Sequence, residues 1–102
     1  MSEENARLLL RIVVRGRVQG VGFRAWTQHQ GQLHGLEGWV RNLRDGSVEA
    51  MLAGPVDRIA VMVKAMREGP HGSQVDAVEE YPATKEEFGP PTSGGFEVRR
   101  TA

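Results

Sequence analysis

The sequence predicts an α+β fold in which two helices cover one face of an antiparallel sheet. Several short segments alternate apolar and polar residues, a pattern typical of half-buried strands, and two longer segments have helical features. These segments follow one another in the order strand, helix, strand, strand, helix, strand. The chain has 102 residues, so we expect a single domain over residues 1–102 with a modest core.

The first strand is predicted from Leu8 to Val18. Its apolar residues share one parity and its arginines the other; they are Leu8, Leu10, Ile12, Val14 and Val18 against Arg11, Arg15 and Arg17. A strand with this alternation buries one of its faces. Residues 1–7 before it are polar and acidic, and we expect them to be flexible.

A helix is predicted from Phe23 to His34, because this stretch contains no proline and leads to Gly35, a residue type that often ends helices. Its apolar stripe is weak, since Gln30, Gly31 and His34 lie where the stripe should continue. A glycine inside a helix costs about 1 kcal/mol relative to alanine.

A hairpin is predicted next. Leu36 to Leu43 and Ser47 to Ala53 both alternate like strands, and the dipeptide Asp45-Gly46 between them is a strong signal for a tight turn. The two strands are therefore expected to be antiparallel neighbours.

The second half of the chain repeats the helix and strand order. Gly54-Pro55 opens a helix whose apolar residues fall on one face until Gly69-Pro70 ends it: Val56, Ile59, Met62 or Val63, and Met66. We expect a strand from Gln74 to Tyr81, a loop from Pro82 to Gly95 and a short closing strand from Phe96 to Arg99. The order β-α-β-β-α-β with an extra C-terminal strand is that of a ferredoxin-like sandwich.

Composition excludes several classes of function. The chain has no cysteine, which rules out disulfides, thiolate metal sites and a thiol nucleophile. The N-terminus lacks the apolar core of a signal peptide, and no apolar run has the length of a membrane span. We therefore expect a cytoplasmic protein without a membrane partner.

Charge is unevenly distributed although the net charge is zero. From Arg7 to Arg44 there are seven arginines and one acid, Glu37, whereas from Asp45 onward there are six basic and ten acidic residues. The neutral total argues against non-specific nucleic-acid binding. The basic first half would attract a small anion.

One glycine-rich segment after the first strand is the predicted anion site. Glycines let successive backbone N–H groups turn toward a ligand, and the N-terminus of the following helix adds positive potential. Arg24 falls in the first turn of that helix, where its guanidinium could bind two phosphate oxygens at once. The expected backbone cradle consists of Gly16, Arg17, Val18, Gln19, Gly20, Val21 and Gly22.

Three other interpretations of this segment exist. Gly20 to Ala25 fits the dinucleotide fingerprint, but a chain this short cannot supply the six-stranded sheet of that fold. A phosphatase loop with a cysteine nucleophile is excluded by composition. A plain glycine-rich turn beside a surface arginine remains open on spacing alone.

Together these motifs resemble the acylphosphatase family. The resemblance rests on Gly16 to Arg24, Gly35 to Asn42, Asp45 to Glu49 and Gly69-Pro70, and it covers nearly the whole chain. It implies a metal-independent hydrolase without a cofactor that cleaves acyl phosphates to a carboxylate and inorganic phosphate, the latter also an inhibitor. By the same resemblance Arg24 binds the phosphate, Asn42 orients the water, and the backbone N–H groups of the cradle form the phosphate loop.

The chemistry of these residues agrees with that resemblance. Phosphoryl transfer needs positioning and charge stabilisation more than covalent catalysis. An amide such as that of Asn42 is a poor base, but an acyl phosphate has a good leaving group, so orienting a water could suffice. Taken alone, Asn42 could equally be a polar residue at a strand end. Relative to the family, Gly31 and His34 are unusual, so we expect a looser or shifted first helix.

Two other functions are compatible with parts of the sequence. A non-catalytic anion-binding or RNA-binding module could share the fold, but the chain has only six aromatic residues and no net positive charge. A regulatory domain of a larger maturation enzyme is a third possibility, against which we expect a free-standing monomer. His29, His34 and His71 have no metal-ligand spacing, so no metal site is expected.

Overall fold

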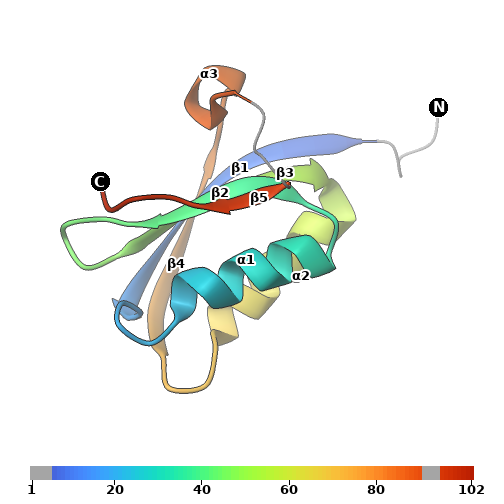
Figure 1. Ribbon diagram of the computed structural model, residues 1–102. Coiled ribbons are helices and arrows are strands. Elements are labelled where there is room, and N and C mark those ends of the chain that lie inside the picture. The colour runs from blue at the N-terminus through green and yellow to red at the C-terminus, as the bar shows by residue number, and fades with distance from the viewer. Residues whose placement is uncertain (1–5, 91–94) are drawn as a thin grey trace.

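Five strands form one sheet, and two long helices cover one of its faces in the computed structural model (Figure 1). The structure describes residues 6–90 and 95–102. The elements are β1 Arg7–Arg17, α1 Phe23–Leu33, β2 Glu37–Asn42, β3 Val48–Pro55, α2 Val56–Glu68, β4 Gln74–Pro82, α3 Lys85–Phe88 and β5 Phe96–Val98. Residues 1–5 of the segment expected to be flexible lie outside the described residues, and β1 begins at Arg7.

The strand order is β4-β1-β3-β2-β5. Neighbours among the first four strands are antiparallel, whereas β5 pairs with β2 in parallel, so the complete sheet is mixed. The predicted ferredoxin-like fold with an extra C-terminal strand is confirmed. The apolar alternation does not specify the direction in which that last strand pairs.

The main core lies between the sheet and the two long helices. Alternate residues of β1 and β3 point into it and meet the apolar face of α2; among them are Leu10, Ile12, Val14, Val48, Ala50, Leu52, Ile59, Met62, Val63 and Met66. Leu8, predicted on the same side as Leu10, is exposed at the start of β1. The period of two in the strands and of about 3.6 in α2 therefore identified this core.

Gly31 in α1 has a packing role. The helix runs from Phe23 to Leu33 without a shift, and Gly31 is buried. A Cβ at this position would come within 2.8 Å of three ring atoms of Phe96, which is 1% exposed. The glycine that weakens the apolar stripe thus lets β5 pack directly against α1.

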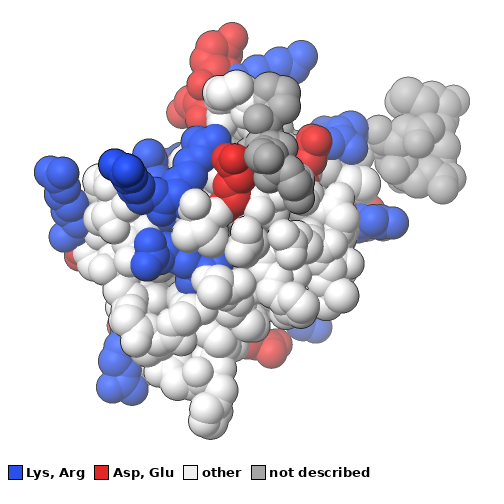
Figure 2. All heavy atoms as spheres, viewed as in Figure 1, with Lys and Arg blue, Asp and Glu red and all other residues white. Residues whose placement is uncertain are grey.

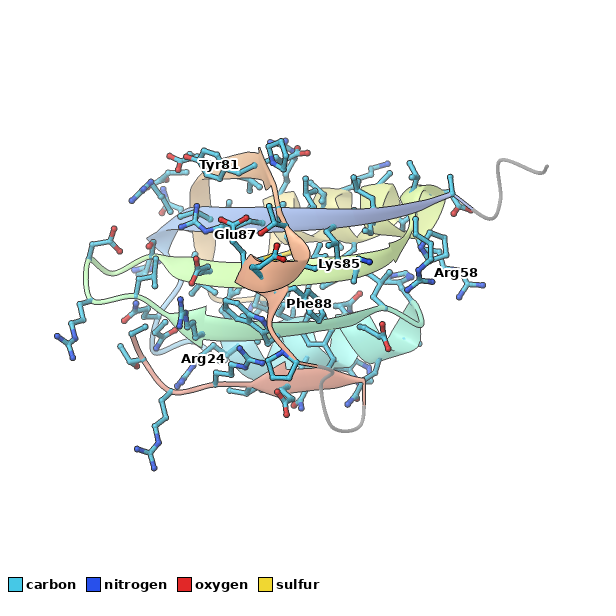
Figure 3. All side chains as sticks on the ribbon, turned by 90° about the horizontal axis from the view of Figure 1, so that it is seen from above. Arg24, Arg58, Tyr81, Lys85, Glu87 and Phe88 are labelled. Carbon is cyan, nitrogen blue, oxygen red and sulfur yellow. The ribbon has the colours of Figure 1, made fainter. Side chains whose placement is uncertain are left out.

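The face of the sheet opposite the long helices carries a short helix, α3, over a small second core (Figures 1 and 3). Phe88 of α3 packs there with Trp39, whose indole Nε1 donates to the carbonyl oxygen of Phe88 at 2.9 Å. Thr84 and Glu87 form a capping box at the start of α3. The prediction of a loop throughout Pro82 to Gly95 is wrong at Lys85–Phe88, and residues 91–94 of that loop lie outside the described residues.

Within residues 6–90 and 95–102, no helix combines the length and the apolar character needed to cross a membrane.

Candidate active site

The sheet topology brings the glycine-rich loop and Asn42 to one end of the sheet. Val14, near the end of β1, lies opposite Val48 of β3, and Val48 lies opposite Asn42, the last residue of β2. The loop that follows β1 therefore begins close to the point where β2 ends. The N-terminus of α1 follows the loop at the same end.

A cavity of about 240 Å³ occupies this end of the sheet. It is lined by Val18, Gly20, Gly22, Phe23, Arg24, Ala25, Asn42 and Val98. Five of these residues belong to the site predicted from the sequence, and they include both predicted catalytic side chains. Figure 3 shows Arg24 toward the end of the sheet that carries the β2–β3 turn.

Neither predicted catalytic side chain has a polar partner among the described residues. Within the part of the chain that the structure describes, the guanidinium of Arg24 and the amide of Asn42 make no hydrogen bond or ion pair. Each is half-buried. Their polar groups are therefore available to a ligand in the cavity.

The loop between β1 and α1 requires glycine for its backbone. Gly20 and Gly22 have φ angles of 77° and 80°, and a Cβ added at either would meet no atom within 4 Å. Conformation, not space, selects glycine at these positions. Gly22 is also the N-cap of α1; no described side chain caps this end, and the first turn holds no acidic residue. No described side chain therefore neutralises the positive potential of this helix N-terminus, which can stabilise a bound anion.

Four residues of the predicted cradle do not line the cavity. Gly16 lies at an irregularity between β1 and β4, where a Cβ would collide with the carbonyl oxygen of Gln74. Arg17 is exposed, Val21 packs against the main core, and Gln19 directs its side chain to the β2–β3 turn. The role of their backbone N–H groups stays a prediction.

Three residues that line the cavity are absent from the prediction. Phe23 and Ala25 flank Arg24 and were assigned only to the helix. Val98 comes from β5, whose pairing beside β2 brings it opposite Val40. No local pattern in the sequence specifies which strand β5 joins, so Val98 could not have been identified.

Beside the cavity, charged and polar groups fix the β2–β3 turn. Asp45 accepts hydrogen bonds from the side chain and the backbone N–H of Ser47, and Arg15 of β1 bridges Asp45 to Glu79 of β4. The bonds from Ser47, and then the one from Arg15, lower the pKa of Asp45 to about 2. The carboxylate therefore keeps its charge, and the turn its bonds, over the neutral and mildly acidic range.

On the opposite face of the sheet, three strands are joined by an ionic triad. Glu49 of β3 is 5% exposed and accepts a hydrogen bond of 2.6 Å from Nε of both Arg11 and Arg41. Burial disfavours the charged carboxylate, but the two arginines outweigh it, so the pKa of Glu49 lies below its ordinary value. Arg11 and Arg41 therefore stabilise the sheet and do not line the cavity.

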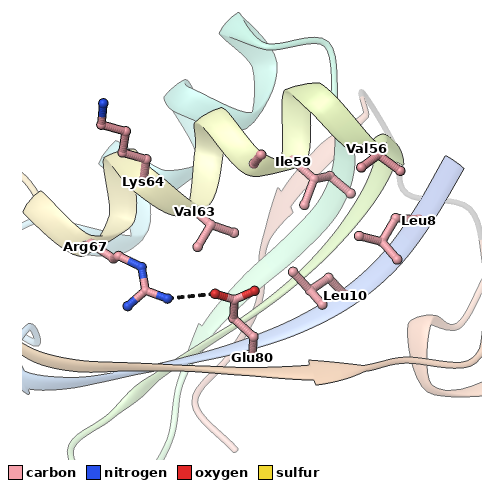
Figure 4. Close-up of a pocket in the computed structure, with 9 residues that line it drawn as sticks. Leu8, Leu10, Val56, Ile59, Val63, Lys64, Arg67 and Glu80 are labelled. Atoms are coloured by element: carbon pink, nitrogen blue, oxygen red, sulfur yellow. Dashed lines mark hydrogen bonds and ion pairs between the residues drawn. The ribbon is translucent and has the colours of Figure 1, made fainter. Parts of the chain in front are cut away.

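Two further cavities lie elsewhere. One of about 390 Å³ lies between α2 and strands β1 and β4, with an apolar wall and the Arg67–Glu80 ion pair at its edge (Figure 4). One of about 870 Å³ lies beside α3 and contains Phe88, Leu9 and Ala53. Neither includes Arg24 or Asn42. The described residues contain no cluster of three or more histidine, aspartate or glutamate side chains suited to a metal ion.

Comparison with known proteins decides the family. A sequence model described as "Acylphosphatase" matches residues 10–98 of this chain. The chain belongs to the acylphosphatase family. It is 52% identical over 83 residues to the acylphosphatase of Bradyrhizobium diazoefficiens, which covers 81% of this chain and 84% of that protein. It is 61% identical over 71 residues to the acylphosphatase of Nitrobacter hamburgensis, which covers 70% and 72% of the two chains.

The fold comparison agrees. The solved structure of an acylphosphatase from Coxiella burnetii superposes on this chain with a TM-score of 0.80 and 31% identity, over 91% of this chain and 93% of that one. The resemblance noted in the sequence is thus confirmed, and with it the prediction of an acylphosphatase, a hydrolase acting on acyl phosphates.

Proposed function

We propose that this acylphosphatase binds the phosphoryl group of its substrate with Arg24 and the backbone N–H groups of Gly16 to Gly22, while Asn42 orients the attacking water. The observation that carries this proposal is the cavity of about 240 Å³ in which the loop, Arg24 and Asn42 meet. The products would be a carboxylate and inorganic phosphate.

The phosphate half of the site follows from charge and geometry. The equatorial oxygens of a transferring phosphoryl group carry the negative charge, and a protein lowers the barrier by placing donors around them. A loop with two left-handed glycines and an uncapped helix N-terminus offers backbone donors. The guanidinium of Arg24, free of partners among the described residues, adds a planar pair of donors.

The water half of the site rests on Asn42. Its side-chain oxygen can accept a hydrogen bond from a water molecule and hold that water on the far side of phosphorus from the leaving carboxylate. Orienting a reactant in this way accounts for a large part of the rate acceleration in many enzymes. Because the leaving carboxylate is stable without protonation, the reaction requires neither a strong base nor a general acid.

The proposal includes hydrolysis without a metal ion or cofactor. Benzoyl phosphate hydrolysis in the presence of a chelator tests this, with inorganic phosphate added as a competitive inhibitor. Arg24→Ala should lose about 100- to 1,000-fold in rate and its affinity for phosphate. Asn42→Ala should lose turnover and keep phosphate affinity. Normal hydrolysis by Asn42→Ala would contradict the role of that residue.

An RNA-binding function has no support from Trp39 on the open face of the sheet, and the exposed ring of Tyr81 on the same face has the guanidinium of Arg11 over it at 5.2 Å. Trp39, the large aromatic residue of β2 on this face, is 3% exposed, and Arg41 and Arg99 lie over its ring at 4.8 and 4.7 Å. Bases need an accessible aromatic surface for stacking. Filter binding to single-stranded RNA at two salt concentrations should therefore detect no tight, salt-sensitive complex.

We further propose that the protein is a cytoplasmic monomer. The absence of cysteine supports a reducing compartment, since secreted proteins of this size commonly need disulfides. Light scattering at several protein concentrations tests the monomer, and cell fractionation tests the compartment.

A further inference from the structure

The side chain of Gln19 joins the phosphate loop to the turn that follows Asn42. Its Nε2 donates to the carbonyl oxygens of Leu43 and Ser47, both at 2.8 Å. We infer that Gln19 is a positioning residue, which sets the distance between the bound phosphoryl group and the water held by Asn42. This inference rests on the proposed function, which assigns only the backbone of Gln19 to the site.

The location of Gln19 suits this role. Val18 before it is 1% exposed and belongs to the main core, and Val21 after it packs against the same core. The loop is thus anchored to the helix side of the sheet on both sides of Gln19. The Gln19 side chain links this loop to the hairpin of β2 and β3, and one of its two hydrogen bonds reaches Leu43, the residue next to Asn42.

The partner atoms of Gln19 are themselves fixed. The N–H of Leu43 donates to the oxygen of Ser47 at 2.8 Å, and the N–H of Gly46 donates to the oxygen of Leu43 at 3.1 Å. The backbone N–H and the hydroxyl of Ser47 both donate hydrogen bonds to the carboxylate of Asp45. Gln19 therefore binds to a rigid turn. Its two hydrogen bonds fix the position of the loop relative to that turn, and so relative to the adjacent Asn42.

A primary amide is the group that this arrangement requires. Its nitrogen carries two hydrogens, and two carbonyl oxygens accept them without a buried charge. A glutamate would place acceptors against acceptors, a methionine of similar length has no donor, and an asparagine is one methylene too short to keep both bonds. The side chain is thus specified by chemistry as well as by size.

The first test compares Gln19→Met with Gln28→Met. Gln28 is also half-buried and donates its Nε2 to a backbone oxygen, that of Phe96 at 3.0 Å, but it joins α1 to β5. With benzoyl phosphate, kcat of Gln19→Met should fall by on the order of 10- to 100-fold, because small misplacements of reacting groups have effects of this size. The inhibition constant of inorganic phosphate should change less than about threefold, and Gln28→Met should keep the wild-type kcat.

A double variant separates positioning from loss of structure. If Gln19 acts through Asn42, Gln19→Met should reduce kcat in the wild-type background and have no further effect in the Asn42→Ala background. Circular dichroism establishes that each variant is folded. Equal losses in both backgrounds would overturn the inference, as would a wild-type kcat for Gln19→Met.

A pH profile of Gln19→Glu gives an independent measurement. Two carbonyl oxygens facing the carboxylate raise its pKa, and the protonated acid regains one donor. The kcat of this variant relative to wild type should therefore rise as the pH is lowered. Asp45 stays ionised in this range because its pKa is about 2, and hydrogen bonds to Glu79 and Asp45 raise the pKa of Arg15 above its ordinary value. The other charged residues near this turn are Arg17 and Arg44. A ratio that does not depend on pH would overturn the inference.

The outcomes distinguish this inference from the proposed function. Normal turnover by Asn42→Ala would overturn the role of Asn42 and the positioning role of Gln19 together. A large loss for Asn42→Ala beside normal turnover for Gln19→Met would overturn the role of Gln19 alone. A loss of phosphate affinity equal to the loss of kcat in Gln19→Met would make Gln19 part of the phosphate site instead.

Discussion

The role of Arg24 depends on the shape of its guanidinium group as well as on its charge, and a substitution by lysine separates the two. Arg24→Lys keeps a cation in the cavity but replaces a planar fork of donors with a single ammonium group. We expect kcat/KM for benzoyl phosphate to fall by about 10- to 100-fold, since part of the donor set around the phosphoryl oxygens is lost.

A matched control for Arg24→Lys is Arg58→Lys. Arg58 donates to the carbonyl oxygen of His34 near the other end of α1 and does not line the cavity. This variant should keep the wild-type kcat/KM. An Arg24→Lys variant as active as the Arg58→Lys variant would show that charge alone suffices at position 24.

At the residue scale, the sequence was informative where a side chain has a distinctive chemical role. Arg24 and Asn42 stand in short motifs, and the structure places both at one cavity. The sequence does not predict the contacts of the Gln19 side chain, because its partners are the backbone carbonyl oxygens of Leu43 and Ser47. Every residue has such an oxygen, so the sequence contains no sign of the contact.

At the scale of elements, α1 and β5 show how a weak pattern can be misread. The helical pattern predicts that Gly31 weakens the helix, whereas the structure packs it closely against the Phe96 ring. The contact joins residues far apart in the chain, and periodicity within one helix cannot reveal it. By contrast, α3 had a local signal, the Thr84 to Glu87 capping box, inside a stretch that its prolines and glycines marked as a loop.

The contact predicts the sign of one stability change. Gly31→Ala would gain about 1 kcal/mol in an ordinary helix. Here the new methyl group collides with a buried ring, and overpacking costs about 1–3 kcal/mol. We expect a net decrease in the free energy of unfolding, measured by urea denaturation.

The same substitution in a Phe96→Leu background serves as the control. Leucine leaves room beside position 31, so Gly31→Ala should there be neutral or stabilising. A stabilising effect of Gly31→Ala in the wild-type background would contradict the proposed contact.

The triad that joins β1, β3 and β2 predicts a pH dependence of stability. The ordinary pKa of Glu49 is 4.5, and its folded-state pKa is lower because Arg11 and Arg41 together outweigh the effect of burial. The contribution of Glu49 is thus fully present above about pH 5 and decreases as the pH falls through the folded-state pKa. Glu49→Gln should lower the free energy of unfolding by about 1–3 kcal/mol at pH 7.

This difference between wild type and Glu49→Gln should close as the pH is lowered below about 4.5, which urea denaturation at several pH values would measure. Glu68→Gln is a suitable control, because Glu68 is exposed and has no hydrogen bond or ion pair among the described residues. That variant should lie within about 0.5 kcal/mol of wild type. A constant difference for Glu49→Gln at all pH values would show that the ionised form of Glu49 contributes nothing.

At the scale of the whole molecule, the uneven charge noted in the sequence separates into two groups. Arg7, Arg11, Arg15 and Arg41 form ion pairs with acidic residues of the fold. Arg17, Arg24 and Arg44 form none with the described residues. Arg17 is the last residue of β1, and Arg44 follows Asn42 by two positions, so these three charges lie at the end of the sheet that holds the cavity. Figure 2 shows basic side chains gathered where Figure 1 places the C-terminus.

This placement predicts a salt dependence of the reaction. Unpaired arginines raise the local concentration of an anionic substrate, and salt screens them over a Debye length of about 10 Å at 0.1 M. Arg17→Gln and Arg44→Gln should each lower kcat/KM for benzoyl phosphate by about two- to fivefold at low salt, an effect of potential and not of contact. The loss should vanish near 1 M salt, where the Debye length is about 3 Å.

Arg7→Gln is the control, because Arg7 pairs with Glu37 and begins β1 about 30 Å from the loop. Losses that persist at high salt would mean that Arg17 or Arg44 contacts the substrate, and equal losses for Arg7→Gln would mean that only the total charge of the molecule matters.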